Sequence, residues 1–159
     1  MKTFCRALMI LFSIGSIHAG ASFAEPGWFW QNPRPQAGGL IGVAVVDPQT
    51  TFAVGALGSI VRTRDGGNTW THQSSGTSDT LTAVTFMDAN AGWAIGGEFG
   101  AVILHTTNAG ETWTQQFDGP RDLRLRGVSF VDAQTGWAVG WAGIILHTND
   151  GARSMASTS

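Results

Sequence analysis

The stretch Thr63-Arg64-Asp65-Gly66-Gly67-Asn68-Thr69-Trp70 decides the fold, because it occurs again further along the chain. A second copy at residues 106–113 reads TTNAGETW, 43 residues later. A third copy at residues 148–155 reads TNDGARSM and has lost the second glycine and the tryptophan. Self-similarity at a fixed period of this size is typical of repeat architectures, in which each unit is one small element of supersecondary structure.

A second motif precedes each copy and defines the rest of the repeat. It reads LIGVAVVDPQTTFAV at residues 40–54, LTAVTFMDANAGWAI at 81–95 and LRGVSFVDAQTGWAV at 125–139. Alternating apolar residues, an Asp-led turn, a second apolar run and a Gly-rich break together predict short antiparallel strands. Four such strands per repeat describe one blade of a β-propeller. We therefore predict an all-β chain of about two and a half to three blades, at residues 25–75, 76–118 and 119–155, with a polar tail at 156–159.

The eight-residue motif, called the Asp-box below, has a mechanical interpretation at each position. Asp65 and Asn108 can accept hydrogen bonds from backbone N–H groups two residues on, as in an Asx turn. Gly67 and Gly110 can supply a positive φ at little steric cost. The tryptophan that ends each complete box is expected to wedge between neighbouring sheets. The positions assigned to this structural role are Thr63, Asp65, Gly67, Thr69, Trp70, Thr106, Asn108, Gly110, Thr112, Trp113, Thr148 and Asp150.

These boxes resemble those of the BNR/Asp-box propellers, a superfamily that includes sialidases and sortilin-like receptors. The fuller pattern, with WQNPRPQ at residues 30–36 and VSFVDAQTGWAVG at 128–140, is most similar to the photosystem II stability/assembly factor-like repeat proteins. That resemblance implies a propeller of about six or seven blades that acts as a binding scaffold. Three blades are fewer than such a ring needs, so we expect a truncated product. Self-association through exposed blade faces, completing a ring, is the alternative.

The N-terminus reads as a secretory signal peptide over residues 1–24. Lys2 and Arg6 form a basic start, residues 7–17 are apolar, and small residues follow that favour cleavage after Ala24 or Ala21. An uncleaved anchor is the alternative, although the apolar run is about half the length of a membrane span. We expect an exported protein with no stable span after cleavage, periplasmic or extracellular, and in the thylakoid lumen only if its source is photosynthetic.

Composition argues against several classes of function. The formal net charge is −2, and it becomes −4 once Lys2 and Arg6 are removed, which disfavours nucleic-acid binding. The chain has no tyrosine, the residue that sialidases of this superfamily use as nucleophile. His105 and His147 share one repeat position and are interpreted as strand residues in preference to metal ligands. We predict no catalytic residues, no metal and no cofactor.

A binding surface for a protein partner is the functional hypothesis. In a blade, the loops between the second and third strands lie on the same face as the loops that enter the inner strand. That face would collect Glu98, Phe99, Trp141, Arg121, Asp122, Arg124 and Arg126. Arginine beside exposed aromatic rings is the composition of interface hot spots. Two alternatives stay open: a solvated loop with no partner, and a fragment of a secreted Asp-box carbohydrate-active enzyme that lacks its catalytic blades.

Overall fold

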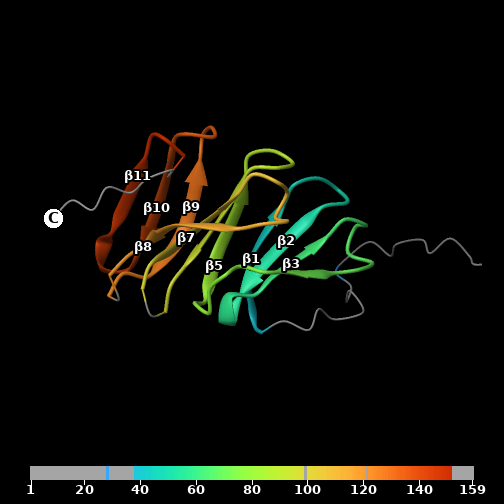
Figure 1. Cartoon of the computed structure of the whole chain (residues 1–159), viewed down its shortest axis with the longest axis horizontal. Helices are drawn as coiled ribbons and strands as arrows, with labels where there is room; N and C mark the ends of the chain where they lie inside the picture. Colours follow the sequence, from blue (N-terminus) through green and yellow to red (C-terminus); the bar gives the residue numbers. More distant parts are fainter. Residues whose placement is uncertain (1–27, 29–37, 99, 121, 152–159) are drawn as a thin grey trace, which may run out of the picture.

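The computed structural model describes residues 28, 38–98, 100–120 and 122–151. The predicted signal peptide, the polar tail, the decayed end of the third Asp-box and two of the predicted binding residues, Phe99 and Arg121, lie outside the described residues. The described part is all-β, as predicted, and has three antiparallel sheets that follow one another in chain order. Figure 1 shows these sheets side by side, from the first in cyan and green to the third in orange and red.

Each sheet is a meander in which sequential strands pair with their neighbours. The first contains β1 (Leu40–Val45), β2 (Thr51–Gly55), β3 (Ile60–Thr63) and β4 (Thr71–Gln73). The second contains β5 (Leu81–Phe86), β6 (Gly92–Gly96), β7 (Val102–Thr106) and β8 (Thr114–Asp118). The third contains β9 (Leu125–Phe130), β10 (Gly136–Gly140) and β11 (Ile145–Thr148). Two complete blades and a third of three described strands form an incomplete propeller, as the repeat count predicted.

Single 3-10 turns join the second and third strands in the outer two sheets. They are η1 (Ala56–Gly58) and η2 (Trp141–Gly143). In each blade the second strand ends in a glycine that packs against the segment entering the inner strand. A Cβ at Gly55, Gly96 or Gly140 would lie within 2.2 Å of a carbonyl oxygen of that segment, so no larger residue fits. This close approach fixes the loop end of every blade in the same way.

The apolar core lies between the sheets, where blades pack face to face. In the first interface, Phe52 stacks on Phe86 of the next blade with ring centroids 4.2 Å apart, and Trp113 meets both rings edge-on. In the second, Trp93 stacks on Phe130 at 3.7 Å. The inner strands β1, β5 and β9 are neighbours along the array. Each blade therefore depends on its neighbours for burial, as in other repeat proteins.

Among the residues that the structure describes, no helix is long and apolar enough to cross a membrane.

Candidate functional site

Each Asp-box forms a turn around one acidic or amide side chain. In the first box the Asp65 carboxylate accepts hydrogen bonds from the backbone N–H of Thr69 at 2.8 Å and from its hydroxyl at 2.6 Å. The Thr63 hydroxyl donates to the same carboxylate at 2.8 Å and accepts from the N–H of Gly67 at 2.9 Å. The expected N–H donor two residues after Asp65 is therefore wrong in detail: the donor lies four residues on. The Thr69 hydroxyl and N–H hold the pKa of Asp65 below its usual value.

The second box reproduces this geometry with an amide in place of the carboxylate. Asn108 Oδ1 accepts from the N–H of Thr112 at 3.0 Å, and its Nδ2 donates to the Thr112 hydroxyl at 2.9 Å. Gly110 has a φ of 77°, and its equivalent Gly67 has a φ of 90°. In the third box, the Thr148 hydroxyl donates to Asp150 at 2.9 Å. Because Asp and Asn can both make these hydrogen bonds, we interpret the box side chain as one that stabilises the turn.

A second Asp-led turn lies beside each box and is bonded to it. In the β1–β2 turn, Asp47 Oδ1 accepts from the N–H groups of Gln49 and Thr50 at 2.7 and 2.8 Å. The carbonyl of Gln49 then accepts from the N–H of Gly66 in the box at 3.0 Å. Asp88 and Asp132 occupy the same place in the later blades. Backbone N–H donors lower the pKa of all three aspartates.

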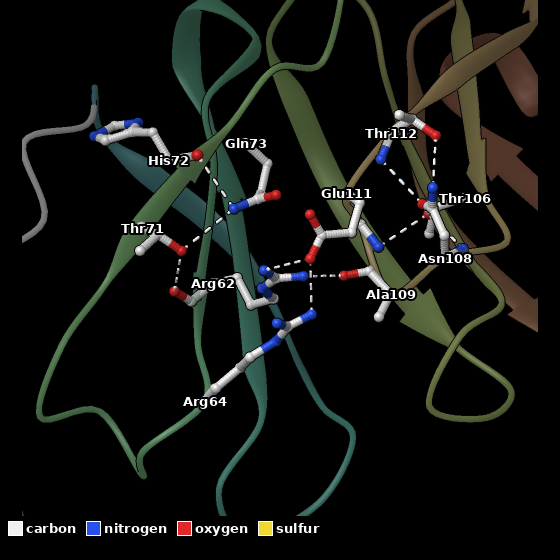
Figure 2. A network of polar contacts seen from close by, with 11 residues as sticks. Arg62, Arg64, Thr71, His72, Gln73, Thr106, Asn108, Ala109, Glu111 and Thr112 are labelled. Carbon is white, nitrogen blue, oxygen red and sulfur yellow. Dashed lines mark hydrogen bonds and ion pairs between the residues drawn. The ribbon is translucent and has the colours of Figure 1, made fainter.

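The second box also docks on the blade before it, through Arg62 of β3 (Figure 2). This arginine is buried, and its guanidinium donates to the carbonyl of Ala109 in the box turn. It also pairs with Glu111 at 3.0 Å, and Arg64 reaches the same carboxylate at 2.9 Å. The hydrogen bond from Arg62, followed by the charges of both arginines, lowers the pKa of Glu111. These contacts join the first two blades.

The loops at the other end of the blades carry the residues predicted to bind a partner. There the N–H of Trp141, at the start of η2, donates to the carbonyl of Arg124 at 2.9 Å. The same bond joins Gly97 to Thr80 in the second blade. Because Gly140 admits no side chain at this crossing, the segment that contains Arg124 lies directly against the loop that carries Trp141. Backbone geometry thus sets the positions of two of the predicted residues.

Two arginines flank the exposed ring of Trp141. The guanidinium carbon of Arg124 lies 5.2 Å from the ring centroid, and that of Arg126 lies 5.3 Å from it. Both distances are within the range of cation–π attraction. Arg124 is half-buried and Arg126 is exposed. Among the described residues neither arginine forms an ion pair.

Glu98 lines the same hollow of about 170 Å³ as these two arginines. Its carboxylate accepts from the hydroxyl of Thr80 at 2.9 Å, and its N–H donates to Asp79 at 3.2 Å. The residues that line the hollow are Thr80, Thr82, Gly97, Glu98, Arg124 and Arg126. The second and third blades therefore build a polar depression with both signs of charge on its wall.

The structure brings together four of the seven residues predicted on this face: Glu98, Arg124, Arg126 and Trp141. Asp122 is exposed and does not line the hollow. Thr80 and Thr82 were not predicted, because a threonine in a strand pattern signals only β-propensity. Thr82 donates to the carbonyl of Leu125 at 2.7 Å and so joins the second blade to the third.

The two predicted strand histidines stack on aromatic rings of their own blades. His105 lies 4.6 Å from Trp93, and His147 lies 4.6 Å from Trp137, measured between ring centroids. No group of three His, Cys, Asp or Glu side chains suited to a metal occurs within the described part of the chain.

Comparison with known proteins agrees with the repeat pattern. The family model for the photosynthesis system II assembly factor YCF48 matches residues 28–117 and 76–158. A solved structure of YCF48 bound to a D1 peptide is 25% identical with a TM-score of 0.63, over 72% of this chain and 38% of that chain. YCF48 from Cyanidioschyzon merolae is 25% identical with a TM-score of 0.64, over 76% and 39%.

The chain thus spans less than two fifths of the length of these solved structures. No curated protein matches the sequence at a significant level. Because the family model covers nearly all of the described residues in two overlapping matches, the chain belongs to the family of the photosynthesis system II assembly factor YCF48.

Proposed function

We propose that this chain is an exported, non-catalytic module that binds an extended segment of a protein partner on its loop face. The observation that carries the proposal is the exposed Trp141 ring with Arg124 and Arg126 beside it. Tryptophan and arginine are the side chains most enriched at interface hot spots. The ring offers apolar area, and the two guanidinium groups offer hydrogen-bond donors, within one small surface.

The chemistry of this face favours a peptide that carries a carboxylate. A guanidinium presents parallel N–H donors that match both oxygens of a carboxylate. Glu98, which lines the same hollow, would repel a second acidic group and would accept a hydrogen bond from a backbone N–H or a basic side chain. A related YCF48 structure contains a D1 peptide, which supports a peptide as the class of ligand.

The acidic residues of the described chain support a function without catalysis. A general acid needs a raised pKa, so that it holds a proton near neutral pH. The pKa values of Asp47, Asp65, Asp88 and Asp132 are lowered by hydrogen bonds within their own turns. Each of these four carboxylates accepts hydrogen bonds within the turn that it stabilises.

Binding of a fluorescently labelled D1 peptide, followed by anisotropy, tests the proposal. We expect R126S and W141A each to weaken binding by about tenfold or more, the loss of about 1.4 kcal/mol or more that truncation at a hot spot causes. The matched control is R64S, which also removes one exposed arginine but lies at the Asp-box end of the first blade.

Equal binding by the parent chain, R126S and R64S would overturn the loop face as the binding site. Equal weakening by R126S and R64S would show that net charge, and not this site, determines binding. Circular dichroism spectra of the three proteins should coincide, because both arginines are exposed and neither lies in an apolar interface.

Export is part of the same proposal and has its own test. We expect the protein secreted by its native host or by a bacterial host to begin at Glu25 or Ser22, the residues after the two candidate cleavage points. Intact mass spectrometry of the purified protein would measure this directly. A protein that retains residues 1–21 would contradict the signal-peptide interpretation. A photosynthetic source would place the mature chain in the thylakoid lumen.

A further inference from the structure

The last described blade exposes an apolar face. The equivalent face is buried in each of the first two blades. We call the side of a sheet that packs on the following blade its outgoing face. In the first two blades this face consists of buried residues: Phe52, Val54 and Ile60, then Trp93, Ile95 and Ile103. The equivalent residues of the third blade are Trp137, Val139 and Ile145, which are 42%, 45% and 69% exposed. The same three positions therefore lie in an interface in the first and second blades and on the surface in the third blade.

The first blade presents the complementary face. The side that packs on the preceding blade, the incoming face, uses Leu81 and Val84 in the second blade and Leu125 in the third, all buried. In the first blade the equivalent inner-strand residues Leu40, Val43 and Val45 are 43%, 66% and 70% exposed. The chain thus carries one half of an interblade interface at each end of its array of sheets.

The two internal interfaces show how these halves fit together. The aromatic ring at the Phe52 position stacks on the residue at the Phe86 position of the following blade, and Trp93 stacks on Phe130 in the same way. The next pair in this series is Trp137 with the residue equivalent to Phe86, and on the bare incoming face that residue is Val45.

We propose that the outgoing face of one copy binds the incoming face of a second copy, with Trp137 packed on the second copy's Val45. Two such contacts, one from each copy to the other, close a ring of six blades. Closed propellers contain four to eight blades, so this number is within the geometric range of the fold. A head-to-tail contact closes into a ring when its rotation allows and otherwise extends into larger assemblies. The closed dimer is the arrangement proposed for this chain, and its formation does not depend on what the loop face binds.

Sedimentation velocity on the full chain and two face variants tests this proposal. W137D places a charge on the outgoing face, and the double variant V43D/V45D places charges on the incoming face. Because all three positions are exposed, each variant is expected to fold as the parent does. The parent should sediment as a dimer and both variants as monomers. L57D is the matched control, since Leu57 is also exposed but lies in η1, on the loop face, and this variant should remain a dimer.

Mixing the two variants separates a head-to-tail contact from other arrangements. A mixture of W137D and V43D/V45D retains one intact pair of faces, so a 1:1 complex should form although neither variant associates alone. Monomers in the mixture would overturn the proposal. Dimerisation of V43D/V45D alone would show that two outgoing faces meet, which also overturns it. A monomeric parent chain, or loss of the dimer in L57D, would do the same.

Discussion

At both interfaces between blades, a carbonyl of an Asp-box turn accepts a hydrogen bond from the preceding blade. The side chain that donates this hydrogen bond differs between the two interfaces. At the first interface the donor is Arg62, which reaches the carbonyl of Ala109. At the second, the donor is the indole N–H of Trp93, which lies 3.4 Å from the carbonyl of the equivalent residue, Gly151.

This difference follows from which ring occupies the outgoing face. The Phe52 side chain has no N–H, so in the first blade Arg62, which pairs directly with Phe52 on the neighbouring strand, supplies the donor. Where a tryptophan replaces the phenylalanine, the arginine position holds His105, which stacks on the tryptophan ring. The pairs Phe with Arg and Trp with His are thus alternative ways to hold the following box. The residues of a box form its turn by themselves, but the position of the second or third box relative to the sheets depends on the preceding blade.

The largest expected effect comes from removing the ring at the centre of the first interface. W113A should lower the free energy of unfolding by about 3–5 kcal/mol, as for large aromatic truncations in cores, because Trp113 is buried against Phe52 and Phe86. W70A should cost less than about 2 kcal/mol, because Trp70 is only half-buried. Thermal or chemical denaturation of both variants measures the difference. Equal losses would mean that the box itself, and not its neighbour, determines the stabilisation.

A smaller effect is expected from the polar contacts that distinguish the two interfaces. R62M keeps an apolar stem of similar length but removes the bonds to Ala109 and Glu111. We expect a loss of about 1.5–3 kcal/mol, the range for hydrogen bonds that involve charged groups. W93F removes one long neutral hydrogen bond, which contributes about 0.5–1.5 kcal/mol, together with part of a fully buried ring. Urea denaturation measures the loss in R62M, and a loss below about 0.5 kcal/mol would show that the bonds to Ala109 and Glu111 do not stabilise the interface.

The smallest effect concerns acid, and it compares the two complete boxes. A carboxylate whose pKa is lowered in the folded state stabilises the fold above its ordinary pKa, about 3.8 for Asp. That contribution is lost as the pH falls through the lower folded-state pKa. Asp65 behaves in this way, whereas Asn108 does not titrate. D65N should therefore change stability by less than about 0.5 kcal/mol at pH 7 and should flatten the loss of stability below pH 4.

Melting temperatures of the parent chain and D65N between pH 7 and pH 2 test the acid prediction. Because Asp47, Asp88, Asp132 and Glu111 also have lowered pKa values, the parent and the variant should both lose stability in acid, the variant less steeply. Parallel curves would show that Asp65 contributes nothing to the acid response.

Much of the fold could be predicted from the sequence because the same strand pattern occurs three times along the chain. The alternation in residues 40–54 and its two copies is a local pattern, and each copy formed the expected hairpin. The box glycines also follow from local geometry, since a positive φ is a property of one residue.

The contacts between blades could not be predicted in the same way. Arg62 and Glu111 are separated by 49 residues, and nothing in the box pattern relates them. The substitution of Arg62 by histidine at the equivalent positions was visible, but its meaning depends on the ring at the Phe52 position across the strand pair. On the loop face, residue types suggested a surface, whereas the placement of Arg124 beside Trp141 follows from a glycine that admits no side chain.

The second and third Asp-boxes are each held in place by the blade before them. Hydrogen exchange of the backbone amides tests this most directly, because local opening of one turn is measured separately from the rest. In R62M the amides of the second box, Gly110 and Thr112, should exchange about tenfold faster or more, while Gly67 and Thr69 of the first box keep their protection. Unchanged exchange in the second box, or equal acceleration in both boxes, would contradict the account.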